Sequence, residues 1–141
     1  MRIYDNNIYS WPWNCCWKTS QDIARHFNLK TEVGDEYLNL PTEHLAVQRL
    51  LDRYGNLLSG FKYLALETGF KEVPDDGKYH SGDIGIFENY TFGPMTIFYP
   101  GAYGPPEMCG GWLVWMPLGM REFNKEFHCD LVQVSIFRGG I

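Results

Sequence analysis

The stretch WPWNCCWKTSQDIARHF, residues 11–27, decides how the rest of the chain is interpreted. Pro12 interrupts the backbone near its start, and Asn14 is a residue type that caps helix N-termini. We therefore expect a helix from about Cys15 to Phe27, with two thiols in its first turn. The positive end of the helix dipole favours a thiolate there over a thiol. A cysteine in this place suits a catalytic nucleophile, and it also suits a small buried hydrophobe.

The helical register separates the two cysteines. At 3.6 residues per turn, Cys16 shares a face with Ile23 and Phe27, which belong to the apolar stripe of this helix. Cys15 falls on the face of Asp22, which we expect to be solvated. Because a nucleophile here must face the sheet that carries its base, Cys16 is the better catalytic candidate and Cys15 the second. A shift of the helix start by one residue would reverse this order.

Composition and charge restrict the class of protein. The 141 residues suffice for a single domain, 1–141, and a hydrophobic content of 45% is typical of a folded protein with its own core. A net charge of −5 without a basic run argues against a nucleic-acid partner. The first ten residues lack an apolar segment, so we expect no signal peptide. No apolar run reaches transmembrane length, so we expect no membrane insertion.

The four cysteines lack the spacing of a metal site. They are Cys15, Cys16, Cys109 and Cys129, and no two of them form a C-x-x-C pair. We therefore expect free thiols, no metal and no cofactor. A weaker alternative is a metal-binding module that uses Cys109, Cys129 and His128.

Helical periodicity dominates up to Thr68, and strand-like alternation follows it. We expect a helix at 42–54, capped by Thr42, and another at 57–68, stopped by Gly69. A polar connector at 28–40 precedes them. Extended segments are predicted at 70–73, 82–87, 95–99, 112–116 and 131–137, with one or two helical turns within 119–127. This order predicts an α+β domain whose N-terminal helices pack on an antiparallel sheet.

Three local strings resemble the NlpC-type papain-like superfamily of cell-wall cysteine peptidases, and a phage branch found among tail-tip genes in particular. They are Asn14-Cys15-Cys16, the strand start GDIGIF at 82–87, and MTIFYPG at 95–101. The family has an Asp-Cys, a Gly-Asp strand and a histidine-bearing strand in the same order. The resemblance implies an NlpC-like, papain-like fold.

The resemblance also includes a departure that bears on activity. Pro94 or Met95 stands where the family has its catalytic histidine, and 110–114 offers no suitable third polar residue. A cysteine–histidine pair needs the base within hydrogen-bond reach of the sulfur. We therefore expect a structural protein of a phage tail tip or baseplate, assembled in the host cytoplasm into the virion. Its expected partners are other tail-tip proteins.

An active cysteine hydrolase is the alternative. Its nucleophile would be Cys16 or Cys15 and its base His80 or His128, with backbone N–H groups at the helix start as the oxyanion hole. Its substrate would be a peptide of peptidoglycan.

Aromatic residues supply the candidate interaction set. Trp11 and Trp13 flank the start of the first helix, whereas Trp112 and Trp115 lie on one predicted strand. Tyr103 lies in a loop rich in glycine and proline. Large aromatic side chains form cores and interfaces alike, so both interpretations stay open.

Overall fold

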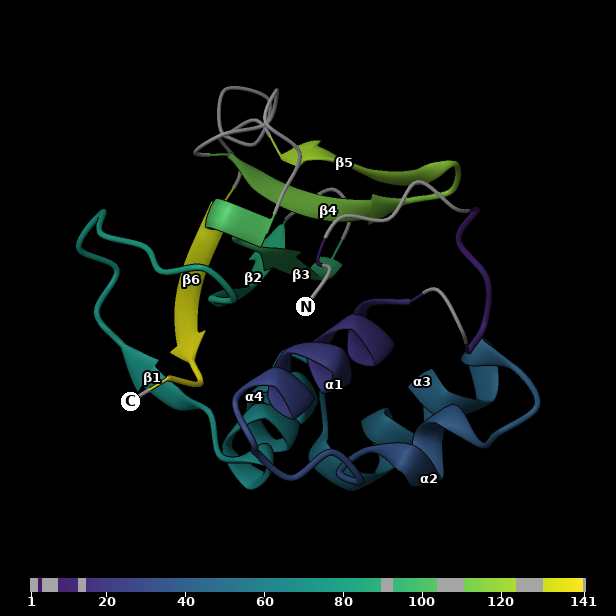
Figure 1. Cartoon of the computed structure of the whole chain (residues 1–141). Coiled ribbons are helices and arrows are strands. Elements are labelled where there is room, and N and C mark those ends of the chain that lie inside the picture. Colours follow the sequence, from purple (N-terminus) through teal and green to yellow (C-terminus); the bar gives the residue numbers. More distant parts are fainter. Residues whose placement is uncertain are drawn as a thin grey trace.

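The helices precede the strands along the chain and gather on one side of a six-stranded antiparallel sheet (Figure 1). This confirms the expected α+β class, with N-terminal helices packed on the sheet. The computed structural model describes residues 3, 8–12, 15–89, 93–103, 111–123 and 131–140, with the backbone alone at 88–89, 93–94 and 131–134. None of the helices in these ranges has the length and apolar character that crossing a bilayer requires.

The helices are α1 (Cys16–His26), α2 (Asp35–Leu38), α3 (Glu43–Tyr54) and α4 (Leu57–Thr68). The boundaries of α3 and α4 follow from their caps. The Thr42 hydroxyl accepts a hydrogen bond from the Leu45 N–H at 3.3 Å, and the Asn56 side chain accepts one from the Ser59 N–H at 2.8 Å. Gly69, at φ +112°, ends α4. The sequence expectation for these two helices is confirmed.

Helix α2 lies within the stretch expected to be a polar connector, and it was not predicted from the sequence. The turn before it is fixed by α1, because the Trp17 Nε1 donates to the Val33 carbonyl at 2.9 Å. The Gln21 Nε2 donates to the Asp35 carboxylate at 2.7 Å. A side chain at Gly34 would meet the Trp17 indole at 2.0 Å, so the close approach requires glycine.

The strands are β1 (Lys71–Val73), β2 (Ile84–Asn89), β3 (Gly93–Phe98), β4 (Trp112–Met116), β5 (Gly119–Phe123) and β6 (Leu131–Arg138). Their order in the sheet is β1-β6-β2-β3-β4-β5, so the last strand inserts between the first two. The prediction of helical turns within 119–127 is wrong for β5. Gly119, at φ +118°, allows a tight turn that pairs β5 with β4 from Met116↔Gly119 to Trp112↔Phe123.

The sheet has a buried cluster on each face. The cluster toward the helices contains Ile84, Ile86, Phe98, Leu113 and Phe137, with Ile23 and Ala24 of α1. The cluster on the opposite face contains Phe87, Ile97, Trp112, Val114, Phe123 and Ile136. A third cluster lies among the helices and contains Cys15, Trp17, Tyr37, Leu38, Ala46, Leu50 and Leu64. Helix α1 therefore contributes to two cores at once.

One buried ion pair joins the start of β2 to the end of β6. Asp83 is 0% exposed, and its carboxylate accepts hydrogen bonds from Arg138 Nε at 2.9 Å and Nη2 at 2.8 Å. The His80 N–H donates to the same carboxylate at 2.8 Å, which closes the turn before β2. The hydrogen bonds between the Arg138 guanidinium and the Asp83 carboxylate raise the pKa of Arg138. The carboxylate thus fixes the Gly82-Asp83 turn against the last strand.

We expect Asp83→Asn to lower the free energy of unfolding by about 3 kcal/mol, because it leaves the Arg138 guanidinium without its counter-charge in a largely buried position. Urea denaturation monitored by circular dichroism measures the loss. The exposed Asp22–Arg25 pair, at 2.9 Å, supplies the control, and Asp22→Asn is expected to cost about 0.5 kcal/mol. Equal losses in the two variants would contradict a special role for Asp83.

Candidate functional site

Cys15 and Cys16 lie at the start of α1 in different surroundings. Cys15 is the N-cap residue, is 1% exposed, and its thiol donates to the Pro12 carbonyl at 3.4 Å. Cys16 is the first helical residue and packs, partly buried, against the sheet-facing core. The expectation that Cys15 faces solvent is wrong. Because its backbone is extended (φ −141°, ψ 169°), its side chain does not follow the helical register and turns inward.

Burial determines the acidity of both thiols. Burial raises the pKa of Cys16 to about 12, and the neighbouring Cys15 and the Glu43 carboxylate add to the effect. Burial also raises the pKa of Cys15. The backbone N–H groups at the helix start act in the opposite direction and are outweighed. Both cysteines are therefore neutral thiols at physiological pH.

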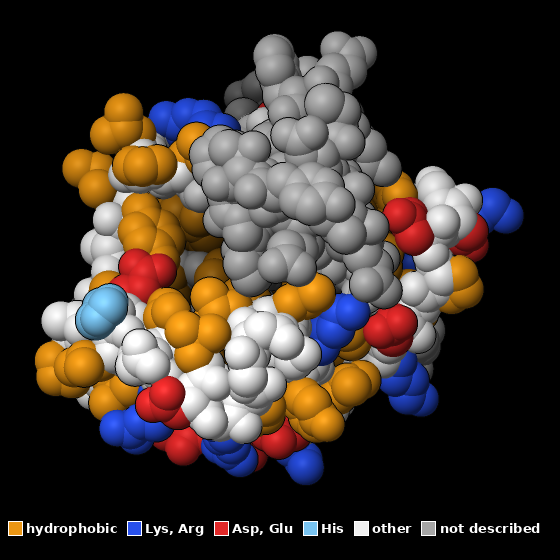
Figure 2. Space-filling view, turned by 180° about the vertical axis from the view of Figure 1, so that it is seen from behind, with side chains coloured by type: hydrophobic (Ala, Val, Ile, Leu, Met, Phe, Trp, Pro, Cys, Tyr) orange, Lys and Arg blue, Asp and Glu red, His pale blue; other side chains and the backbone are white. Residues whose placement is uncertain are grey.

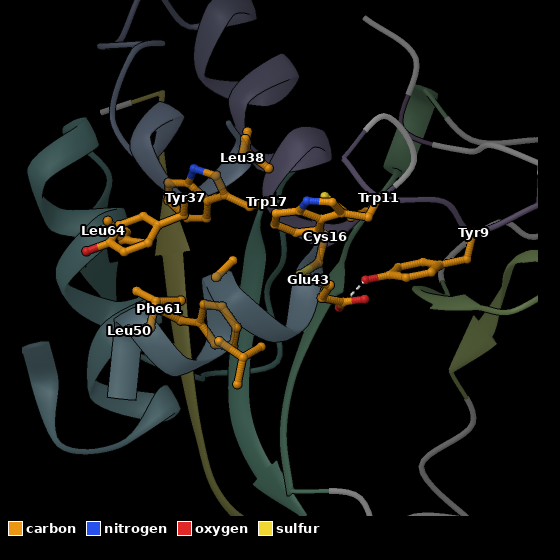
Figure 3. Close-up of a pocket in the computed structure, with 13 residues that line it drawn as sticks. Tyr9, Trp11, Cys16, Trp17, Tyr37, Leu38, Glu43, Leu50, Phe61 and Leu64 are labelled. Atoms are coloured by element: carbon orange, nitrogen blue, oxygen red, sulfur yellow. Dashed lines mark hydrogen bonds between the residues drawn. The ribbon is translucent and has the colours of Figure 1, made fainter. Parts of the chain in front are cut away.

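A small cavity, whose lining side chains Figure 3 shows, and an open groove both have Cys16 in their walls. The cavity, about 50 Å³, extends between the helices toward Trp17 and Tyr37. The groove, about 260 Å³, runs from Cys16 toward β3 and β4. We call it the Cys16 groove, and its lining consists of Tyr9, Cys16, Glu43, Val47, Leu57, Phe61, Met95, Thr96, Val114 and Trp115. Its walls are largely apolar, and Glu43 is the one acidic residue among them.

Met95 and Thr96 of β3 line the side of the groove where the family resemblance places the catalytic histidine. Thr96 pairs with Ile86 across the strands, so its side chain faces the helices, as Ile86 does. Met95 pairs with Phe87 and packs against the cluster on the opposite face of the sheet. A threonine hydroxyl does not serve as a proton acceptor at neutral pH. Among the described groove residues there is no imidazole.

The described histidines lie elsewhere. His80 is exposed and contributes its backbone N–H to the Asp83 turn, and it lines neither hollow at Cys16. His26 is exposed on α1, with its Nε2 at 3.2 Å from the Tyr103 hydroxyl. His44 is exposed in the first turn of α3. The fourth candidate base, His128, lies outside the described residues. The structure thus brings Cys15 and Cys16 together without bringing His80 to them.

The candidate aromatic residues divide between core and surface. Trp112 is 5% exposed and belongs to the cluster on the sheet face opposite the helices. Trp115 donates a hydrogen bond from Nε1 to the Thr19 hydroxyl at 2.9 Å. Trp11 donates from Nε1 to the Leu40 carbonyl at 3.0 Å. Tyr103 is 37% exposed. Trp13 lies outside the described residues.

Sequence reasoning missed the contact between Tyr9 and Glu43. The Tyr9 hydroxyl donates to Glu43 Oε1 at 2.5 Å, although the two residues are 34 positions apart. Burial and this hydrogen bond raise the pKa of Tyr9 well above its ordinary value. Local sequence carries a signal for Glu43 only as a first-turn residue of α3, and no local pattern links it to Tyr9.

Metal binding finds no support in the described part of the chain, where no three histidine, cysteine or acidic side chains form a ligand cluster. Cys109, Cys129 and His128, the alternative metal set, lie outside it. Comparisons with protein-family models, curated proteins and solved structures find no match. The geometry therefore defines an α+β protein with a protonated thiol at a helix start, in a groove whose described residues present no base to it.

We expect iodoacetamide to alkylate Cys16 slowly at pH 7, because a pKa of about 12 leaves a thiolate fraction of about 10⁻⁵. The rate should rise about tenfold per pH unit between pH 7 and 9, since alkylation requires the thiolate. Tandem mass spectrometry of the peptide that contains residues 15 and 16 measures it. Glutathione is the reference for an unperturbed thiol. A Cys16 rate above that of glutathione at pH 7 would show an activated nucleophile.

Proposed function

We propose that this protein is a structural component of a bacteriophage tail tip or baseplate, with an NlpC-like, papain-like fold that lacks the family's thiol chemistry. One observation carries the proposal: Cys16, at the family's nucleophile position, lies in a groove that Thr96 of β3 also lines and whose described lining holds no imidazole. The assignment to a phage particle rests on the sequence resemblance. The proposed location is the virion tail, with other tail-tip proteins as partners.

The electrostatics of the site support a non-catalytic role. A cysteine hydrolase needs a thiolate and a nearby acid that protonates the leaving group. Burial and the Glu43 charge raise the pKa of Cys16, so both act against the thiolate. Cys16 and its neighbours instead serve packing, since the thiol contacts the sheet-facing core.

An apolar corner of the surface supports a role in protein contacts. Figure 2 shows hydrophobic side chains gathered at the upper left, where the β4–β5 hairpin ends. Ile8 is 67% exposed, Met116 44% and Leu118 69%. The Tyr9 N–H donates to the Pro117 carbonyl at 3.1 Å, which places Ile8 beside the hairpin turn. A hollow of about 670 Å³ is lined in part by Met116 and Leu118. Clustered apolar surface of this kind marks protein contacts.

The alternative function is a cysteine hydrolase that cleaves peptidoglycan peptides. The observation in its favour is that Cys16 lies at a helix start and lines an open groove. Incubation of the purified protein with cell-wall sacculi separates the two functions. We expect no loss of turbidity and no released peptides, for the natural chain and for Cys16→Ala alike. Cleavage by the natural chain that is lost in Cys16→Ala would establish the hydrolase instead.

The structural role predicts that the protein is incorporated into virus particles through its apolar corner. We expect quantitative mass spectrometry of particles, produced from the gene in its native genome, to find the natural chain as a stoichiometric component. Leu118→Asp should reduce its incorporation at least about tenfold, because a charge at an apolar contact is costly to desolvate. Leu66→Asp is the matched control, since Leu66 is 53% exposed on α4, and it should leave incorporation unchanged. Absence of the natural chain from the particles would refute the proposal.

A further inference from the structure

Strand β5 is the last strand at one end of the sheet (Figure 1). Among the described strands it has β4 as its one neighbour. An edge strand presents backbone N–H and C=O groups that can pair with a strand of another molecule. The strand at the opposite edge, β1, is only three residues long and carries the exposed Lys71 and Glu72, and both properties oppose such pairing. The longer β5 needs a different protection.

The register of the β4–β5 hairpin determines which groups of β5 point away from β4. Met116 pairs with Gly119 across a two-residue turn, so Gly119 and every second residue after it form hydrogen bonds with β4. Met120 and Glu122 alternate with these residues, and their N–H and C=O groups point to the outer edge. Another strand would therefore meet the backbone of Met120 and Glu122.

The side chain of Arg121 folds over this edge. Its Nη1 donates to the Met120 carbonyl at 2.8 Å, and its Nη2 donates to the Leu118 carbonyl at 3.1 Å. One guanidinium thus holds the outward carbonyl of Met120 and a carbonyl of the turn at the same time. Met120 is 0% exposed, and a carbonyl shielded from water needs a hydrogen-bond donor. Arg121 supplies that donor from a side chain that is itself exposed.

A second copy of β5 would meet two obstacles at this edge. Two copies can pair antiparallel about a two-fold axis perpendicular to the sheet, with Met120 of each copy opposite Glu122 of the other. This register places the two Arg121 side chains directly opposite each other. Each guanidinium would have to leave the Met120 carbonyl, and two positive charges would then lie side by side, which is destabilising.

We propose that Arg121 protects the outer edge of the sheet and keeps β5 from pairing with β5 of a second copy of this chain. Its guanidinium occupies the carbonyl that the second strand would use, and its charge lies where the two copies would meet. This inference rests on the hairpin alone and holds whether or not the protein belongs to a phage tail.

Arg121→Thr tests the proposal, because threonine suits a strand and has neither the charge nor the length of the arginine side chain. We expect the purified variant to dimerise at least about tenfold more tightly than the natural chain, since the edge groups become available for pairing. Sedimentation velocity over a series of concentrations measures the dimerisation constant. Amide hydrogen exchange of the associated variant should show added protection at Met120 and Glu122.

Arg49→Thr is the matched control. Arg49 is exposed on α3, in the helical layer, and its replacement changes the net charge by the same amount as Arg121→Thr. It should leave the dimerisation constant unchanged. An unchanged constant in Arg121→Thr, an equal tightening in Arg49→Thr, or added protection that omits Met120 and Glu122 would each overturn the proposal.

If circular dichroism shows that Arg121→Thr does not fold, Arg121→Lys replaces it. Lysine keeps the positive charge and loses the planar fork that holds two carbonyls at once. We expect this variant to dimerise several-fold more tightly than the natural chain, with an unchanged circular dichroism spectrum. A dimerisation constant equal to that of the natural chain would show that the hydrogen bonds to the carbonyls do not protect the edge, and the proposal would fail.

Discussion

The packing of α1 between two cores is the constraint on which the rest of the structure depends. Ile23 and Ala24 are fully buried toward the sheet, whereas Trp17 is buried among the other helices. Because one helix must satisfy both surroundings, its rotation and its starting point are fixed. Cys16 is consequently held at the boundary of the two cores and Cys15 just outside the helix, inside the helical cluster. The packing of Ile23, Ala24 and Trp17 therefore determines where both thiols lie.

This position decides the competition between the helix dipole and desolvation. The free N–H groups at a helix start favour a thiolate, and the contribution is limited to about 1 kcal/mol or somewhat more. Removal from water disfavours the thiolate much more strongly, and a pKa of about 12 for Cys16 shows that burial prevails. In a cysteine hydrolase a neighbouring imidazolium reverses this balance by compensating the charge. The described groove presents Thr96 at that place instead, and Glu43 adds a charge of the wrong sign.

Local signals predicted those parts of the fold that local chemistry determines. Thr42 and Gly69 have the residue types of helix caps, and α3 begins beside the first and α4 ends beside the second. Strand β5 was missed because its GMREF sequence owes its pairing to the turn at Gly119 and to its neighbour β4, and has no clear alternation of its own. The inward turn of Cys15 was missed because the helix starts one residue later than the register assumed. The Tyr9–Glu43 contact spans 34 positions and depends on tertiary packing that no local pattern encodes.

The position of Tyr9 and the lack of a base among the described groove residues have a common physical reason. A thiol without a counter-ion is most stable in its neutral form, and a neutral thiol gains from contact with apolar atoms more than from contact with water. Tyr9 and Trp115 supply such atoms over Cys16, and they direct their own polar groups away from it, to Glu43 and Thr19. The arrangement that keeps the thiol neutral is therefore also the one that holds Tyr9 over it.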